Sequence, residues 1–216
     1  FESEEGRQEF EQWKEAQAAM EKILNHLGMK YTVGIGEAAF YGPKLDIQYK
    51  NVHGKEDTLA TIQIDMLLAK KFGMEYVDRD GKMATPYILH RTSLGCYERT
   101  LAYLLEKYAG ALPTWMAPTQ VKLLPMGEEQ FDYCDTIADR CMDLGIRAEV
   151  DKSNNTIGYK IRSAQTEKVP YMLVIGGKEL TDGTVSVRSR KDGERGAMKT
   201  DTFLDELLQE IRERRR

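Results

Sequence analysis

The chain has 216 residues, of which 41% are hydrophobic and 31% charged, and its formal net charge is −4. This composition is that of an ordinary folded protein, long enough to bury a core in one large domain or two small ones. It contains no apolar run of about 18 residues that would span a membrane, and its negative charge argues against a general nucleic-acid binder. Three cysteines without zinc-type pair spacing predict reduced thiols in a cytoplasmic protein. The first residue is Phe1 rather than Met, so we expect a piece of a longer polypeptide.

The first part of the chain predicts a long helix followed by antiparallel strands. Apolar residues at three- and four-residue spacing predict a helix over residues 7–27, which ends at Gly28. The turn His53-Gly54-Lys55 is expected to join two strands in an antiparallel hairpin. The predicted strands are residues 30–33, 44–52, 58–65 and 75–78, and a short helix is expected at 67–71.

One face of the predicted hairpin is polar. Because side chains alternate between the two faces of a strand, this face gathers Lys44, Asp46, Gln48, Thr61, Gln63 and Asp65. Two interpretations of the pattern stay open at this point. The face is either the solvated side of a sheet or the polar floor of a substrate pocket.

The segment from Tyr87 to Gly110 joins an apolar strand to a helix through a turn of small residues. The strand ends in His90 and Arg91, and the helix carries Arg99 in its first turns. A histidine at a strand end is either a hydrogen-bonded structural residue or a metal ligand. Arg99 adds a fixed positive charge to the helix dipole, and both stabilise an anion such as a triphosphate.

A proline-containing segment, Pro113 to Pro118, predicts a domain boundary, which we place between residues 116 and 117. Beyond it, strands and helices alternate, which predicts a mixed sheet covered by helices in an α/β domain of about 100 residues. The Arg188-Ser-Arg190-Lys191 cluster is a candidate RNA contact, whereas the arginines from Arg212 onward are expected to form a solvated helix end. The predicted strands are 121–124, 147–150, 169–175 and 184–190, and the predicted helices are 128–144, 158–167 and 202–214.

Several of these segments together resemble the threonyl-tRNA synthetase family. Leu94-Gly95-Cys96-Tyr97-Glu98-Arg99 is similar to motif 3 of class II aminoacyl-tRNA synthetases. The runs Phe40-Tyr41-Gly42-Pro43-Lys44, Thr61-Ile62-Gln63-Ile64-Asp65 and His90-Arg91 resemble the threonyl enzymes in particular. Further on, Ile157 to Arg162 and Val169 to Val174 resemble their anticodon-binding domain. The resemblance implies an α+β fold over residues 1–116, part of the class II antiparallel sheet with helices, and a mixed-sheet α/β anticodon-binding domain over 117–216.

The resemblance also implies a ligase, which activates threonine with ATP and Mg and transfers it to tRNA. Arg99 then clamps the ATP phosphates, because a guanidinium holds two oxygens at once. Lys44 neutralises charge at the reacting carboxylate or phosphate. Tyr41, Thr61 and Gln63 match positions of the substrate pocket. His90 matches one of three protein ligands of a zinc ion that grips the amino group and hydroxyl of threonine, and so rejects valine.

Parts of the family pattern have no counterpart in this sequence. Motif 1, which builds the family's homodimer, and motif 2, which supplies further ATP contacts, do not appear. The other two zinc ligands, a cysteine and a histidine, are also missing, and one histidine does not hold a zinc ion. We therefore expect a fragment that does not form the adenylate by itself, derived from an enzyme that is a homodimer at full length.

The anticodon-binding domain looks complete. In the family it reads the threonine anticodon, and the positions that match contacts are Asn154, Lys160, Arg162, Glu179 and Arg188. Single-stranded loops are read by hydrogen bonds to splayed bases with charge support, which such side chains supply. Without the resemblance, Glu179 and Arg188 are equally well explained as an ion pair between strands. The expected partner of this domain is tRNA.

Two alternatives to this prediction remain. A non-catalytic tRNA-binding or accessory protein would account for the missing motifs, but the intact Tyr41, Lys44, Gln63, His90 and Arg99 speak against a decayed site. A prolyl, histidyl or glycyl relative would share the second domain. The Tyr-Gly-Pro-Lys and Thr-Ile-Gln runs, and the placement of His90 nine residues before Arg99, favour the threonyl family.

Overall fold

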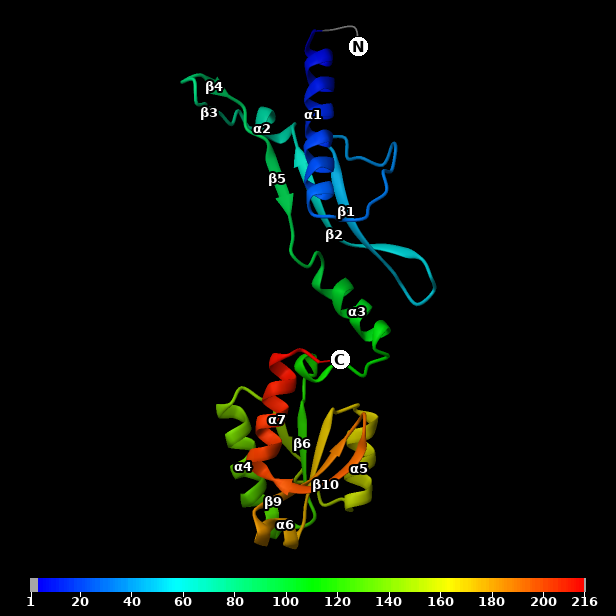
Figure 1. The fold of residues 1–216 in the computed structure, drawn as a ribbon, viewed down its shortest axis with the longest axis vertical. Coiled ribbons are helices and arrows are strands. Elements are labelled where there is room, and N and C mark those ends of the chain that lie inside the picture. Colours follow the sequence, from blue (N-terminus) through cyan, green and yellow to red (C-terminus); the bar gives the residue numbers. More distant parts are fainter. Residues whose placement is uncertain (1–3, 216) are drawn as a thin grey trace. The chain divides into compact units, whose positions relative to one another are not determined.

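The computed structural model describes residues 4–215 and divides the chain into two compact units, Phe1–Tyr103 and Leu104–Arg216 (Figure 1). The predicted domain boundary between residues 116 and 117 stays a prediction. None of the described helices is long and apolar enough to cross a membrane. The antiparallel sheet of the first unit and the mixed sheet of the second confirm the predicted fold classes.

The first unit is built on a three-stranded antiparallel sheet in the order β1-β2-β5. The predicted hairpin is confirmed, since β1 and β2 pair antiparallel around the turn at Gly54. An ion pair of 3.3 Å between Lys70 Nζ and Glu9 Oε1 links α2 to α1. The elements up to the unit boundary are α1 (Glu4–His26), β1 (Lys44–Lys50), β2 (Glu56–Asp65), α2 (Leu68–Lys71), β3 (Tyr76–Val77), β4 (Met83–Ala84), β5 (Ile88–Arg91) and α3 (Tyr97–Lys107), within which the boundary falls.

One expectation for this part of the chain is corrected. Residues 30–33 form no strand in the described structure, and Val33 is 60% exposed, so no burial of its side chain favours strand pairing there. The apolar face of α3 is largely exposed. Tyr97, Leu101 and Leu105 follow one side of the helix and are 75%, 53% and 44% exposed. Helical periodicity predicted the helix correctly, but periodicity does not say whether a partner covers the apolar side.

The second unit is built on a five-stranded mixed sheet in the order β10-β9-β8-β6-β7. The strands β6, β7 and β8 are parallel, and β9 and β10 continue the sheet antiparallel. The elements are η1 (Thr114–Met116), β6 (Val121–Pro125), η2 (Glu128–Gln130), α4 (Phe131–Asp143), β7 (Ala148–Val150), α5 (Ile157–Thr166), β8 (Tyr171–Ile175), α6 (Gly177–Asp182), β9 (Thr184–Ser189), β10 (Gly193–Lys199) and α7 (Thr200–Arg212).

Each face of this sheet has its own apolar core. On one face, α4 and α7 pack against β6, β8 and β9 around fully buried residues such as Leu123, Leu173 and Phe203. On the other face, α5 packs through Ala164 against Leu124 and Met172. Figure 1 shows α4 and α7 on one side of the strands and α5 on the other. Alternating burial along β9, where Val185 and Val187 point into the first core, leaves the intervening side chains on the α5 face.

Candidate functional site

Three of the predicted pocket residues form one row across the sheet of the first unit. Lys44 on β1 is the register partner of Gln63 on β2, and Gln63 is the register partner of His90 on β5. Residues that are directly opposite in an antiparallel sheet point to the same face, with neighbouring Cβ atoms about 4.5–5.5 Å apart. The strand pairing therefore brings together side chains from sequence positions that lie far apart.

Tyr41 joins this row from the turn that precedes β1. Its hydroxyl donates a hydrogen bond of 2.5 Å to Oε1 of Gln63, and its ring lies 6.1 Å from that of His90 in an edge arrangement. Gly42 makes this approach possible, since a Cβ atom there would lie 1.8 Å from the carbonyl oxygen of Ile64. Only a glycine lets the backbone next to Tyr41 come so close to β2.

Lys44 is held by a carboxylate that the sequence did not single out as a site residue. Its ammonium lies 2.5 Å from Oδ2 of Asp46, and the hydroxyl of Thr61 donates to Oδ1 of the same carboxylate at 2.8 Å. Thr61 and Asp46 are register partners, one step along the sheet from Lys44 and Gln63. The side chains of Lys44 and Asp46 are 28% and 17% exposed, so a charged pair lines a partly open surface.

His90 is held by a second carboxylate, that of the fully buried Asp65. One oxygen of Asp65 lies 2.9 Å from Nε2 of His90, and the other accepts hydrogen bonds of 2.9 Å from the backbone N–H groups of Leu67 and Leu68. Burial acts to raise the pKa of Asp65, but the hydrogen bonds from Leu68, His90 and Leu67 outweigh it and lower the pKa below its usual value. Asp65 is therefore an ionised acceptor at neutral pH.

The charge of Asp65 determines which nitrogen of His90 carries the proton. An ionised carboxylate only accepts, so Nε2 of His90 must be the donor, and the neutral imidazole keeps its lone pair on Nδ1. This is the arrangement in which histidines commonly bind metals, with the other ring nitrogen donating to a carboxylate. Of the two interpretations offered by the sequence, the hydrogen-bonded structural residue and the metal ligand, the geometry is compatible with both.

The described residues do not complete a zinc site on their own. Within residues 4–215, no three histidine, cysteine or acidic side chains lie close enough together to hold a metal ion. A protein zinc site needs three or four such ligands. Among the described residues, His90 alone does not make such a site.

Arg99 is anchored to the same sheet from the start of α3. Its Nη1 donates a hydrogen bond of 3.2 Å to the carbonyl oxygen of Thr58, on β2. The turn before α3 reaches the sheet through Gly95, which has a φ of +65° and where a Cβ atom would lie 2.1 Å from the carbonyl oxygen of Leu59. Because α3 begins against β2 in this way, an exposed guanidinium is fixed on the sheet that carries the row of polar side chains.

In the second unit, the predicted anticodon contacts lie on the α5 side of the sheet or at the carboxyl ends of its parallel strands. Asn154 is exposed in the loop after β7, and Arg162 is exposed on α5. Arg188 is the register partner of Met172, whose side chain packs in the α5-side core, so Arg188 points to that face as well. Its partner is Glu194 on β10, at 3.5 Å, and not Glu179, with which an ion pair was considered.

Glu179 and Lys160 are both engaged with the backbone. Oε2 of Glu179 accepts from the N–H of Gly176 at 2.9 Å and so caps the short helix α6. Lys160 is only 3% exposed, and its ammonium donates to the carbonyl oxygens of Pro125 and Asp151 at 3.0 and 2.9 Å. Both helix α6 and strand β10 were absent from the predicted elements.

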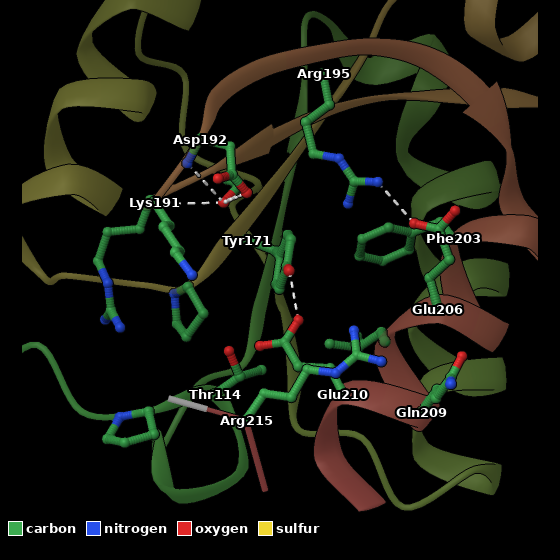
Figure 2. A pocket seen from close by; sticks show the side chains of 15 residues that line it. Thr114, Tyr171, Lys191, Asp192, Arg195, Phe203, Glu206, Gln209, Glu210 and Arg215 are labelled. Carbon is green, nitrogen blue, oxygen red and sulfur yellow. Dashed lines mark hydrogen bonds and ion pairs between the residues drawn. The ribbon is translucent and has the colours of Figure 1, made fainter. Parts of the chain in front are cut away.

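A hollow in the second unit is lined by Arg190 and Lys191 of the candidate RNA-contact cluster, but by none of Asn154, Lys160, Arg162, Glu179 and Arg188. It has a volume of about 450 Å³ and lies between the start of β8, the β9–β10 turn and α7. Two pairs of its side chains hydrogen-bond to each other: Figure 2 shows Tyr171 pointing to Glu210, at 2.5 Å, and Arg195 pointing to Glu206, at 2.7 Å. Burial, together with the hydrogen bond to Glu210, raises the pKa of Tyr171 well above its usual value. These two paired sets of side chains give no indication of a ligand.

Comparison with known proteins is consistent with this geometry. Residues 3–108 match the family model of the tRNA synthetase class II core domain (G, H, P, S and T), and residues 120–210 match that of the anticodon binding domain. These two matches place the chain in the class II aminoacyl-tRNA synthetases.

The relatives narrow this class. A threonine–tRNA ligase of Clostridium perfringens (strain SM101 / Type A) is 55% identical over 204 residues, covering 94% of this chain and 32% of that protein. One of Clostridioides difficile (strain 630) is 44% identical over 204 residues, with the same two coverages. The crystal structure of the RNA binding domain of threonyl-tRNA synthetase from Cryptosporidium parvum Iowa II matches with a TM-score of 0.81 and 33% identity, over 92% of this chain and 50% of that one. The chain belongs to the threonyl-tRNA synthetase family, and it spans about a third of the length of the curated relatives.

Proposed function

We propose that this chain takes part in the reaction of a threonine–tRNA ligase. In that reaction a carboxylate oxygen of threonine attacks the α-phosphorus of ATP and pyrophosphate leaves. A hydroxyl of the terminal ribose of tRNA then takes the acyl group, and AMP leaves. The observation that carries the proposal is the row of Lys44, Gln63 and His90 across three strands, with Tyr41 hydrogen-bonded to Gln63.

The chemistry of this row suits an amino acid with a hydroxyl group. Tyr41 and Gln63 offer hydrogen-bonding groups at fixed positions, and Lys44 offers a positive charge for a carboxylate or phosphate oxygen. Arg99 offers a guanidinium fork for the phosphates of ATP, which binds with Mg. A site that satisfies a hydroxyl rejects the methyl isostere strongly, because its polar groups would otherwise stay unpaired.

A zinc ion at this site would supply Lewis-acid chemistry and would hold the amino group and hydroxyl of the substrate. Within this chain, His90 would contribute one ligand. Asp65 keeps the His90 ring in one orientation and holds the proton on Nε2. We propose further that the enzyme works as a homodimer in the cytoplasm, as the family resemblance implies.

The test is threonine-dependent exchange between ATP and pyrophosphate, measured with a full-length enzyme that contains this segment. We expect exchange with threonine and not with valine, and a loss of at least about 100-fold for Arg99→Ala, because removing a donor that stabilises developing charge usually costs that much. The 216-residue chain alone is expected to show no exchange. Exchange by this chain alone, or a full-length enzyme that prefers another amino acid, would refute the proposal.

We propose that the second unit recognises the threonine anticodon through Asn154, Arg162, Glu179 and Arg188. Arg188→Ala in the full-length enzyme should weaken aminoacylation about tenfold or more through tRNA binding, since a lost base contact costs on the order of 1–3 kcal/mol. It should leave ATP–pyrophosphate exchange nearly unchanged, because that step does not involve tRNA. Equal losses in the two assays would count against this assignment.

A further inference from the structure

Lys160 differs from the other predicted anticodon contacts because its ammonium is inside the protein. The side chain is 3% exposed, whereas Asn154 and Arg162 are exposed. A buried ammonium must have its donors satisfied, and here two of the three bind backbone carbonyl oxygens. A lysine that contacts an RNA phosphate acts as an exposed point charge, and the burial of Lys160 does not suit that role.

The two carbonyl groups belong to neighbouring parallel strands at the point where both strands end. Pro125 is the last residue of β6, and Asp151 directly follows β7. The last hydrogen bond between the strands runs from Asp151 N–H to Leu123 O, at 3.0 Å. Beyond it the chains separate, and the ammonium of Lys160 bridges the two carbonyl oxygens at 3.0 and 2.9 Å.

The bridge lies at the base of the loop that carries Asn154. Above it, Oδ1 of Asp151 accepts from the N–H of Ser153 at 3.0 Å, and Oγ of Ser153 accepts from Asn155 Nδ2 at the same distance. The loop leads directly into α5, which carries Lys160 itself and the exposed Arg162. One ammonium thus fixes the start of the loop against both strands and against the helix that follows it.

We infer that Lys160 is a positioning residue for RNA recognition, which holds the 151–156 loop so that Asn154 is presented in one conformation, and that it does not contact RNA. The inference rests on the proposed anticodon recognition. The bridge keeps the loop residues ordered in the free protein. Without it, RNA binding itself would have to order them. Ordering even one residue costs about tenfold in affinity.

The salt dependence of binding separates a positioning role from a direct contact. Each phosphate neutralised by a lysine contributes about 0.7 to the slope of log K against log salt concentration for single-stranded RNA. For Lys160→Met, we expect about tenfold weaker binding of a threonine anticodon stem-loop with an unchanged slope. A slope reduced by about 0.7 would show that Lys160 contacts phosphate, and would overturn the inference.

Two further measurements connect the effect to the loop. In a double-mutant cycle, Asn154→Ala should cost much less in the Lys160→Met background than in the wild type, because both changes disable the same loop. Additive losses would contradict the inference. Lys22→Met is the matched control: it removes the same charge from an exposed position on α1, outside the anticodon-binding unit, and binding should change less than twofold.

A third measurement uses only the wild-type chain, so it stands even if the variant fails to fold. Amine acylation, read by mass spectrometry without RNA, should leave Lys160 unmodified while Lys191 reacts. Modification of Lys160 in the free chain, with protection by RNA, would overturn the inference. Failure of the wild-type chain to bind the stem-loop would instead refute the proposed anticodon recognition. The bridge can still be tested in that case, because we expect faster amide exchange of residues 151–156 in Lys160→Met than in the wild type.

Discussion

The link between Asp65 and His90 makes a prediction that can be worked out from the structure. Asp65 is fully buried and makes three hydrogen bonds: two caps on the first N–H groups of α2 and one bond to His90. In Asp65→Ala, the lost caps cost about 1 kcal/mol. The lost hydrogen bond from His90 to this ionised carboxylate costs about 1–3 kcal/mol more. The expected loss of local stability is therefore about 2–4 kcal/mol.

Amide hydrogen exchange at Leu67 and Leu68 measures this loss directly. Since about 1.36 kcal/mol corresponds to a factor of ten, exchange should accelerate by roughly 30- to 1,000-fold in Asp65→Ala. Asp65→Asn should accelerate it by much less, because asparagine is as good a cap as aspartate. Asp46→Asn, which leaves the α2 cap intact, serves as the control.

The imidazole of His90 offers a second and sharper readout. In Asp65→Asn, the amide oxygen is needed by the α2 N–H groups, so the NH₂ group faces Nε2 of His90, which must then accept. The proton should move to Nδ1, and nitrogen NMR of the ring above pH 8, where imidazoles are neutral, distinguishes the two tautomers. If His90 is already protonated on Nδ1 in the wild type, or if Asn leaves the tautomer unchanged, the reasoning about Asp65 is refuted.

Three other predictions concern thiols, pH and a glycine. Burial raises the pKa of Cys134 to about 12 and that of Cys141 to about 11, whereas Cys96 is exposed. A thiol reagent should therefore modify only Cys96 in the native chain and all three thiols after unfolding. Rapid reaction of a second thiol in the native chain would contradict the packing. Burial acts to raise the pKa of Asp151, but hydrogen bonds from Ser153 and the charges of Lys160 and Lys122 lower it overall. The ionised carboxylate therefore stabilises the fold above about pH 4, and this contribution is lost as the pH falls further. Amide exchange between pH 6 and 2.5 should show that loss in the wild type and not in Asp151→Asn. Gly95→Ala should destabilise the first unit more than Gly81→Ala. Both positions have a positive φ, which costs about 1–2 kcal/mol for alanine, but only a Cβ at residue 95 meets a carbonyl oxygen, at 2.1 Å. Equal urea midpoints of unfolding for the two variants would refute this.

Hydrophobic periodicity predicted most of the fold because burial follows it closely in the second unit. The central strands 121–124 and 169–175 have apolar residues on both faces, as strands covered by helices on both sides require. β10 was missed because its sequence, GERGAMK, has two glycines and three charges, and only pairing with β9 makes it a strand. At residues 30–33 the error was the reverse, because a strand was predicted and none is present. An alternating pattern without a neighbouring strand forms no hydrogen-bonded ladder.

The two carboxylates at the candidate site escaped sequence reasoning for a common physical reason. Asp46 lies two residues from Lys44, and Asp65 two residues from Gln63, so each shares a strand face with a predicted pocket residue. A polar residue on such a face reads equally as solvated or as part of a pocket, and only its hydrogen-bond partners decide. Asp46 is bound by Lys44 and Asp65 by His90. These partners depend on the strand register, which is set by turn geometry and strand pairing in the folded chain.

Lys160 illustrates the same limit from the other side. Its position in a family motif suggested an RNA contact, and lysine is a usual residue for that role, but residue type carries no information about depth. Depth comes from the helix: Lys160 and Ala164 are four residues apart on α5 and thus share the side that faces the sheet. Arg162 lies between them on the opposite side and is exposed. Within one turn of helix, the side that packs on the strands separates the residue that shapes the loop from the residue free to reach a partner.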